Sequence, residues 1–132
     1  MTCAGERWPD EGSLPDSIRA RWVLLWDGEC GLCRRSVRWV LARDRRGLLL
    51  AMPYQDALAW LPQPVRERSP RQAHLRAPDG RYWGGGAAVI RLAGLLGHPL
   101  LERVLSLPGP RHAVGWAYRW VAAHRSALAP WV

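Results

Sequence analysis

The chain has 132 residues, of which 48% are hydrophobic, and its formal net charge of +8 at pH 7 rests on arginine alone, since no lysine is present. This length and apolar content predict one folded domain with its own core and exclude a wholly disordered chain. Because no apolar run approaches the roughly 18 residues of a membrane-spanning helix and residues 1–18 lack a secretory signal pattern, we expect a cytoplasmic protein.

Residues 1–20 are expected to form a flexible leader, and residues 21–132 the domain itself. Pro9, Gly12 and Pro15 interrupt this leader, and its carboxylates outnumber its arginines. Terminal segments of this composition are frequently left outside the folded core. Cys3 is expected to be an incidental exposed thiol, with pairing to a redox partner as the alternative.

A strand followed by a helix is the first predicted unit. The run Trp22–Trp26 is short, apolar and rich in aromatic and β-branched residues, which favours a buried strand. From Leu32 onward, apolar residues recur every three or four positions with arginines between them, a pattern typical of an amphipathic helix. Cys30 and Cys33 fall at the junction, with Cys30 at the N-terminus of the helix.

Two thiols at the start of a helix suit disulfide exchange. Unpaired N–H groups and the positive end of the helix dipole stabilise an anion there, so the pKa of the Cys30 thiol is expected to fall from about 8.5 towards 7 or lower. We therefore predict that Cys30 is the exposed attacking thiolate. Cys33, one turn further on, is predicted to be the more buried resolving thiol.

A C-x-x-C pair can also be half of a zinc site, or a structural pair without chemistry. The chain has no second C-x-x-C pair, and its four histidines are scattered without the spacing of zinc ligands. We therefore favour redox chemistry with no metal and no organic cofactor. A chain with few cysteines also suits a reducing compartment, where a lone C-x-x-C pair is more often catalytic.

Arginines occupy the outer face of the predicted helix. Arg34, Arg35 and Arg38 lie within two turns of the dithiol, where they could favour the thiolate and attract an anionic partner such as glutathione or an acidic protein surface. For each arginine taken singly, a solvated helix face is the alternative. Weak nonspecific contact with nucleic acid is possible, but no base-reading motif is present, so no specific nucleic-acid partner is expected.

The later segments complete an α/β order. Gly47 is expected to end the first helix, and a second strand at Leu48–Met52 then gives a right-handed β-α-β unit with parallel strands. The turn Pro78-Asp79-Gly80 predicts a hairpin of antiparallel strands. The other expected elements are a short helix at Asp56–Trp60, strands at Gln72–Ala77 and Arg81–Trp83, and helices at Ala87–Leu96, Leu100–Leu107 and Arg111–Leu128.

The order β-α-β and then β-β-α is that of a thioredoxin-like domain, and the chain also resembles the DCC family of predicted thiol-disulfide oxidoreductases. That family is named for a D-x-x-C-x-x-C pattern, which Asp27, Cys30 and Cys33 match. Further similar segments lie at residues 43–47, 79–81, 85–89 and 118–125, within a resemblance that spans about 21–128. It implies a four-stranded mixed sheet flanked by helices, with extra C-terminal helices, and a reaction class without a particular substrate.

Asp27 has two interpretations, which do not exclude each other. At the end of the strand its carboxylate could lie under the dithiol and accept a proton from Cys33 when that thiol attacks a mixed disulfide. Alternatively, it forms an Asx turn or accepts N–H groups near the helix start.

Three further residues are candidates for substrate binding. In thioredoxin-like folds a cis-proline before the antiparallel strand faces the dithiol, and Pro70 stands in the right order for that role. Gly84 and Gly85 precede a predicted helix, where backbone N–H groups could approach an anion such as a glutathione carboxylate. The alternatives are an ordinary trans-proline and a simple glycine turn.

Trp116 and Trp120 lie one helical turn apart on the last predicted helix. We expect them to cover the sheet, in place of the phenylalanine that the chain lacks. The alternative is an exposed patch for a partner or a membrane surface.

These observations predict a thiol-disulfide oxidoreductase that reduces or exchanges disulfides through Cys30 and Cys33. The expected partners are a disulfide-bearing protein or a small thiol such as glutathione, and the expected state is a monomer. The rival prediction is a noncatalytic module that keeps the fold and binds a protein or membrane through a basic, tryptophan-rich face.

Overall fold

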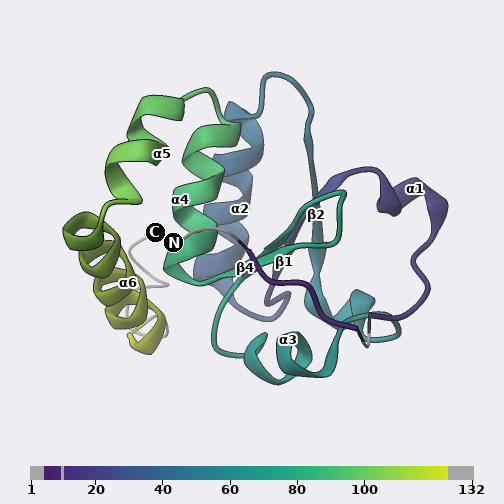
Figure 1. Cartoon of the computed structure of the whole chain (residues 1–132). Coiled ribbons are helices and arrows are strands. Elements are labelled where there is room, and N and C mark those ends of the chain that lie inside the picture. Colours follow the sequence, from purple (N-terminus) through teal and green to yellow (C-terminus); the bar gives the residue numbers. More distant parts are fainter. Residues whose placement is uncertain (1–4, 10, 125–132) are drawn as a thin grey trace.

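A mixed four-stranded sheet organises the chain (Figure 1). The computed structural model describes residues 5–9 and 11–124. β3 is antiparallel to both of its neighbours, β1 and β4, whereas β1 and β2 are parallel. The strands lie in the order β2-β1-β3-β4, with bounds β1 (Trp22–Trp26), β2 (Leu49–Pro53), β3 (His74–Arg76) and β4 (Tyr82–Gly84). The predicted thioredoxin-like α/β class is confirmed.

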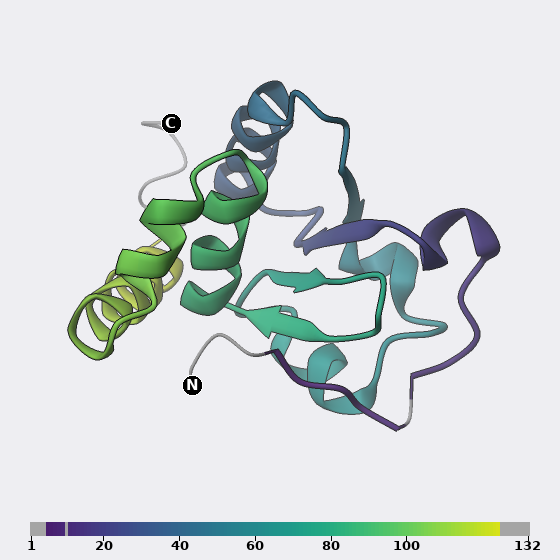
Figure 2. The same cartoon turned by 45° about the horizontal axis from the view of Figure 1, so that its top comes forward.

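Helices cover both faces of this sheet (Figure 2). On one face lie α2 (Gly31–Arg43) and α4 (Gly86–Leu95), and on the other lie α1 (Asp16–Arg19), the 3-10 helix η1 (Tyr54–Ala57) and α3 (Gln63–Arg68). The last two helices, α5 (Pro99–Leu105) and α6 (Pro108–Ala123), pack mainly on α4. Among the described residues, no helix has the length and apolar character needed to cross a membrane.

Two apolar cores, one on each face of the sheet, fix the orientation of β1. Val23 and Leu25 point into the core beside α3, whereas Leu24 points into the core beneath α2 and α4. All three are almost inaccessible to water. A strand buried on both faces carries apolar residues at consecutive positions, which accounts for the unbroken apolar run in the sequence.

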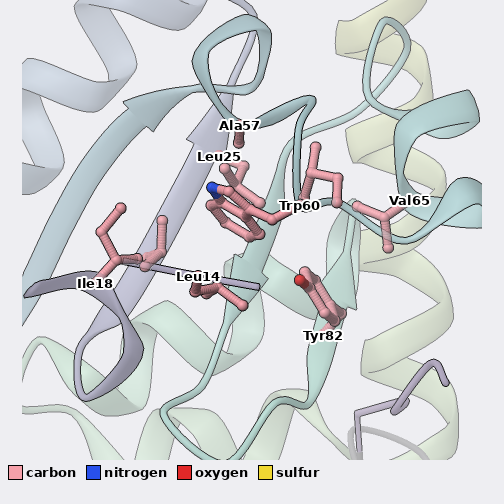
Figure 3. Packing of buried hydrophobic residues seen from close by; sticks show 9 residues of the cluster. Leu14, Ile18, Leu25, Ala57, Trp60, Val65 and Tyr82 are labelled. Atoms are coloured by element: carbon pink, nitrogen blue, oxygen red, sulfur yellow. The ribbon is translucent and has the colours of Figure 1, made fainter. Parts of the chain in front are cut away.

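Part of the segment expected to be a loose leader packs against the sheet instead (Figure 3). Leu14 and Ile18 are each 7% exposed and lie in one core with Trp60 and Tyr82. The backbone of Glu6 also exchanges two hydrogen bonds with Tyr82 in β4 (2.9 and 2.7 Å). The domain therefore begins before residue 21, because the short helices α3 and η1 leave this face of the sheet to be covered by the N-terminal segment.

The last helix also differs from expectation. Trp116 is 64% exposed and Trp120 47%, so neither covers the sheet. Instead α6 approaches α4 so closely that a Cβ on Gly86 would come within 2.8 Å of the Gly115 Cα. Both tryptophans are therefore exposed, as the alternative from the sequence requires.

Candidate functional site

The two thiols lie where β1 ends and α2 begins. Cys30 is the N-cap of α2, and its Sγ accepts a hydrogen bond from the backbone N–H of Cys33 (3.3 Å). Both side chains are partly exposed, and no disulfide joins them. A backbone donor at the N-terminus of a helix stabilises negative charge on the atom that accepts it. The arrangement therefore gives Cys30 Sγ a backbone donor at the helix N-terminus, with a second thiol one turn away.

A side-chain clamp holds the loop before Cys30. Asp27 Oδ1 accepts the backbone N–H of Glu29 (3.0 Å), which is the predicted Asx turn. The same oxygen accepts a hydrogen bond from Gln55 Nε2 (3.0 Å), and Gln55 Oε1 accepts the N–H of Gly28 (3.1 Å). The orientation of the Asp27 carboxylate is thus fixed from two sides.

Gln55 did not emerge from the sequence as a site residue. Trp26 and Pro53 are register partners in the parallel pair of β1 and β2. Residues that follow two parallel strands meet at the same edge of a sheet, so a polar side chain two positions after the second strand was the available signal.

Arg34 lies in the first turn of α2, beside the loop that leads to Cys30. Its guanidinium donates to the carbonyl of Gly28 (3.1 Å), across the turn that leads into Cys30. The side chain is otherwise exposed. It therefore places a positive charge on the dithiol loop while tying the loop to the first turn of α2.

Gly84 and Gly85 lie at this same edge, because β4 runs in the direction of β1. Gly85 has a φ of +58° and donates its N–H to the carbonyl of Ala73 (3.0 Å). A Cβ on Gly84 would collide with the amide of Gln72. The backbone conformation at Gly85 and the close packing at Gly84 therefore require glycine. This agrees with the alternative of a simple glycine turn.

Pro70 lies in the exposed turn after α3, and every peptide bond among the described residues is trans. The prediction of a cis-proline facing the dithiol is therefore wrong. The residue directly before β3 is Ala73, and its N–H donates to Tyr118 Oη (2.7 Å). A proline has no N–H to make this bond.

His74 is a buried titratable residue at the same edge. It is 3% exposed, and its Nε2 lies 3.3 Å from Gln72 Nε2. Among the described residues, its Nδ1 has no hydrogen-bond partner. Burial, and then the positive charge of Arg68, lower the pKa of His74 from its usual 6.5 to about 4. This imidazole is therefore neutral at physiological pH.

We expect this burial to make stability depend on pH. Between pH 6.5 and 4 the unfolded chain protonates His74 and the folded protein does not, so the free energy of unfolding should fall as the pH drops through that window. The shift corresponds to about 3 kcal/mol. Denaturant unfolding at several pH values would measure it, with His74→Gln as the reference that lacks the titrating group. Parallel pH profiles for the two proteins would contradict the assignment.

Comparison with known proteins gives one match. Residues 24–131 match the model of a family described as DCC1-like thiol-disulfide oxidoreductase. No curated protein and no solved structure matches the chain. The matched residues begin within β1 and extend beyond α6, so they contain Asp27, Cys30, Cys33 and the clamp around them.

Proposed function

Because the chain belongs to the DCC1-like thiol-disulfide oxidoreductase family, we propose that it exchanges disulfides through Cys30 and Cys33. The observation that supports this most directly is the N-cap position of Cys30, whose partly exposed Sγ accepts the N–H of Cys33. The proposed substrates are a disulfide-bearing protein or a small thiol compound. The proposed compartment is the cytoplasm, where other thiols would return the pair to its reduced form.

The proposed reaction has two exchange steps. Cys30, as the thiolate, attacks one sulfur of the substrate disulfide, and the other substrate sulfur leaves and takes up a proton. Cys33 then loses its proton and attacks Cys30 Sγ, which forms the Cys30–Cys33 disulfide and releases the second substrate thiol. Two electrons pass from the dithiol to the substrate, and the reverse sequence oxidises a substrate dithiol.

We propose Asp27 as the base that accepts the Cys33 proton in the second step. The Asp27→Asn variant keeps an oxygen that can accept from Glu29 and Gln55, but it cannot take a proton. We expect the first step to keep its rate and the second to slow by about a hundredfold. Rapid quenching with acid, followed by mass measurement of the mixed disulfide, separates the two steps. An unchanged second step would leave Asp27 as a purely structural residue.

The direct test is a single turnover. The reduced protein is mixed with excess small disulfide, and peptide mapping then locates any new disulfide. We expect one intramolecular bond between Cys30 and Cys33, with two substrate thiols released for each chain. If both cysteines remain reduced while the substrate is intact, the proposal fails.

The exposed apolar side chains of α5 and α6 favour a second candidate, a noncatalytic interaction module. Leu100 of α5, Leu107 at the N-cap of α6, and Trp116 and Trp120 of α6 are each about half exposed or more. Such a module would keep its binding partner when Cys30 is replaced by serine, whereas the enzyme would lose disulfide exchange. A pull-down and an exchange assay on the same variant distinguish the two.

A further inference from the structure

A pocket near the end of the sheet at which Cys30 lies is lined by positively charged residues. It lies between α6 and the turn that joins α3 to β3, and its volume is about 490 Å³. Three of its seven lining residues are arginines and none is acidic: the residues are Arg68, Arg71, Gln72, Tyr118, Arg119, Ala122 and Ala123. Such a concave site is large enough for a small organic molecule.

The three arginines have no acidic partner in the described part of the chain. No carboxylate of residues 5–9 or 11–124 lies within ion-pair distance of Arg68, Arg71 or Arg119. The neighbouring acid, Glu67, accepts a hydrogen bond from Gln63 on its own helix (3.2 Å). Three positive charges that line one pocket repel each other, and a bound anion would reduce that repulsion.

Two uncharged residues of this pocket, Tyr118 and Gln72, are held by contacts with the sheet and the segments beside it. Tyr118 Oη accepts the N–H of Ala73 (2.7 Å), which ties α6 to the residue before β3. Gln72 lies against Gly84 and beside the His74 ring. A site whose walls are held before the ligand arrives loses less entropy on binding.

The sheet register connects the pocket to the dithiol. Leu25 of β1 pairs with His74 of β3 in antiparallel register, so the next residues, Trp26 and Ala73, lie beside each other at about the 5 Å spacing of neighbouring strands. The chain reaches Cys30 four residues after Trp26 and reaches Gln72 one residue before Ala73. We therefore expect a ligand as long as a tripeptide, about 10 Å when extended, to present a sulfur to Cys30 and a carboxylate to the pocket.

We infer that the pocket of Arg68, Arg71 and Arg119 binds the carboxylates of a small anionic disulfide, for which glutathione disulfide is the probe. This inference rests on the proposed function and names its substrate class. The pocket then acts on substrate binding and not on the exchange steps themselves.

The test compares three small disulfides in single turnovers of the reduced protein. Glutathione disulfide is anionic, 2-hydroxyethyl disulfide is neutral and cystamine is cationic. The variant Arg71→Ala/Arg119→Ala leaves Arg68 in place because its charge also acts on His74. We expect the half-saturating concentration of glutathione disulfide to rise about tenfold or more. Its maximal rate and the rate for the neutral disulfide should stay unchanged, and the half-saturating concentration of cystamine should not rise.

A matched control removes two arginines far from the site. Arg45 and Arg46 are exposed and follow the C-terminal end of α2, about 20 Å of helix away from Cys30. If Arg45→Ala/Arg46→Ala raises the half-saturating concentration of glutathione disulfide as much as Arg71→Ala/Arg119→Ala does, the net charge of the protein is responsible and the pocket assignment is overturned. The assignment is also overturned if all three disulfides have the same half-saturating concentration with the unaltered protein. Failure to reduce any of them instead overturns the proposed function, and the inference with it.

Discussion

Replacing Cys30 with serine is expected to slow disulfide exchange by at least about a thousandfold. A serine hydroxyl at this position could still accept the N–H of Cys33, so the helix start should be preserved. It would nonetheless lack the thiolate that attacks a disulfide sulfur. The single-turnover assay measures this loss as the rate of substrate thiol release.

Cys33→Ser is expected to fail at a different step. Its Cys30 would still attack, and one substrate thiol would leave, but no second thiol would resolve the mixed disulfide. The protein should therefore accumulate a stable adduct on Cys30 with a single released thiol for each chain. Mass spectrometry of the intact protein reads this out directly.

Cys3→Ser is the matched control for both variants. Cys3 lies outside the described residues, and its replacement should leave exchange unchanged. Retained turnover in Cys30→Ser, or an adduct on Cys33 in place of Cys30, would contradict the assigned order of attack. Loss of turnover in Cys3→Ser would add that thiol to the pathway.

The sequence predicted the dithiol end of the fold well because its signals are local. The change of period from a buried strand to an amphipathic helix falls between Trp26 and Leu32, and the structure has β1 and α2 on either side of that loop. The turn around Asp79 and Gly80 likewise joins β3 to β4. In both cases the deciding interactions involve residues close together in the chain.

Features that depend on distant contacts were not predictable in this way. The segment that forms α3 has no helical pattern of apolar residues, only prolines at its start. It is held by burial of Val65 among residues of other elements. Trp116 and Trp120 carry the pattern of a covering helix, but α6 docks by its glycine backbone on α4 and leaves them exposed. Gln55 reaches Asp27 only because two parallel strands end together.

The least predictable contact joins the N-terminal segment to the centre of the sheet. Arg76 of β3 donates to Glu11 through two nitrogens (2.7 and 3.1 Å), and the Tyr82 hydroxyl donates to the same carboxylate. Burial alone would lower the pKa of Arg76, but the hydrogen bonds and charge of Glu11 outweigh it and raise that pKa. Burial, and then Glu11, also raise the pKa of Tyr82 well above its usual range. This pairing joins residues that lie 65 and 71 positions apart in the chain, so no local pattern reveals it.

Glu11→Gln is accordingly expected to destabilise the fold by about 3 kcal/mol. The amide keeps much of the shape, but the Arg76 guanidinium, whose side chain is 4% exposed, would remain charged without a buried counter-ion. Denaturant unfolding at neutral pH measures the loss, provided that the free energy of unfolding depends on denaturant concentration with the same slope in both proteins. Asp16→Asn is the control in the same segment, because its pair with Arg19 is highly exposed and should contribute less than about 1 kcal/mol.

Removing both charges separates the cost of an unpaired ion from the value of the pair. In Glu11→Leu/Arg76→Met no buried charge remains, and we expect stability to recover to within about 1 kcal/mol of the original protein. A double variant as unstable as Glu11→Gln would instead indicate that the pair itself contributes this free energy, and that the loss does not come from an unpaired ion. A Glu11→Gln variant no less stable than Asp16→Asn would show that Arg76 finds another partner, and the N-terminal segment would then contribute apolar cover to the sheet without an electrostatic anchor.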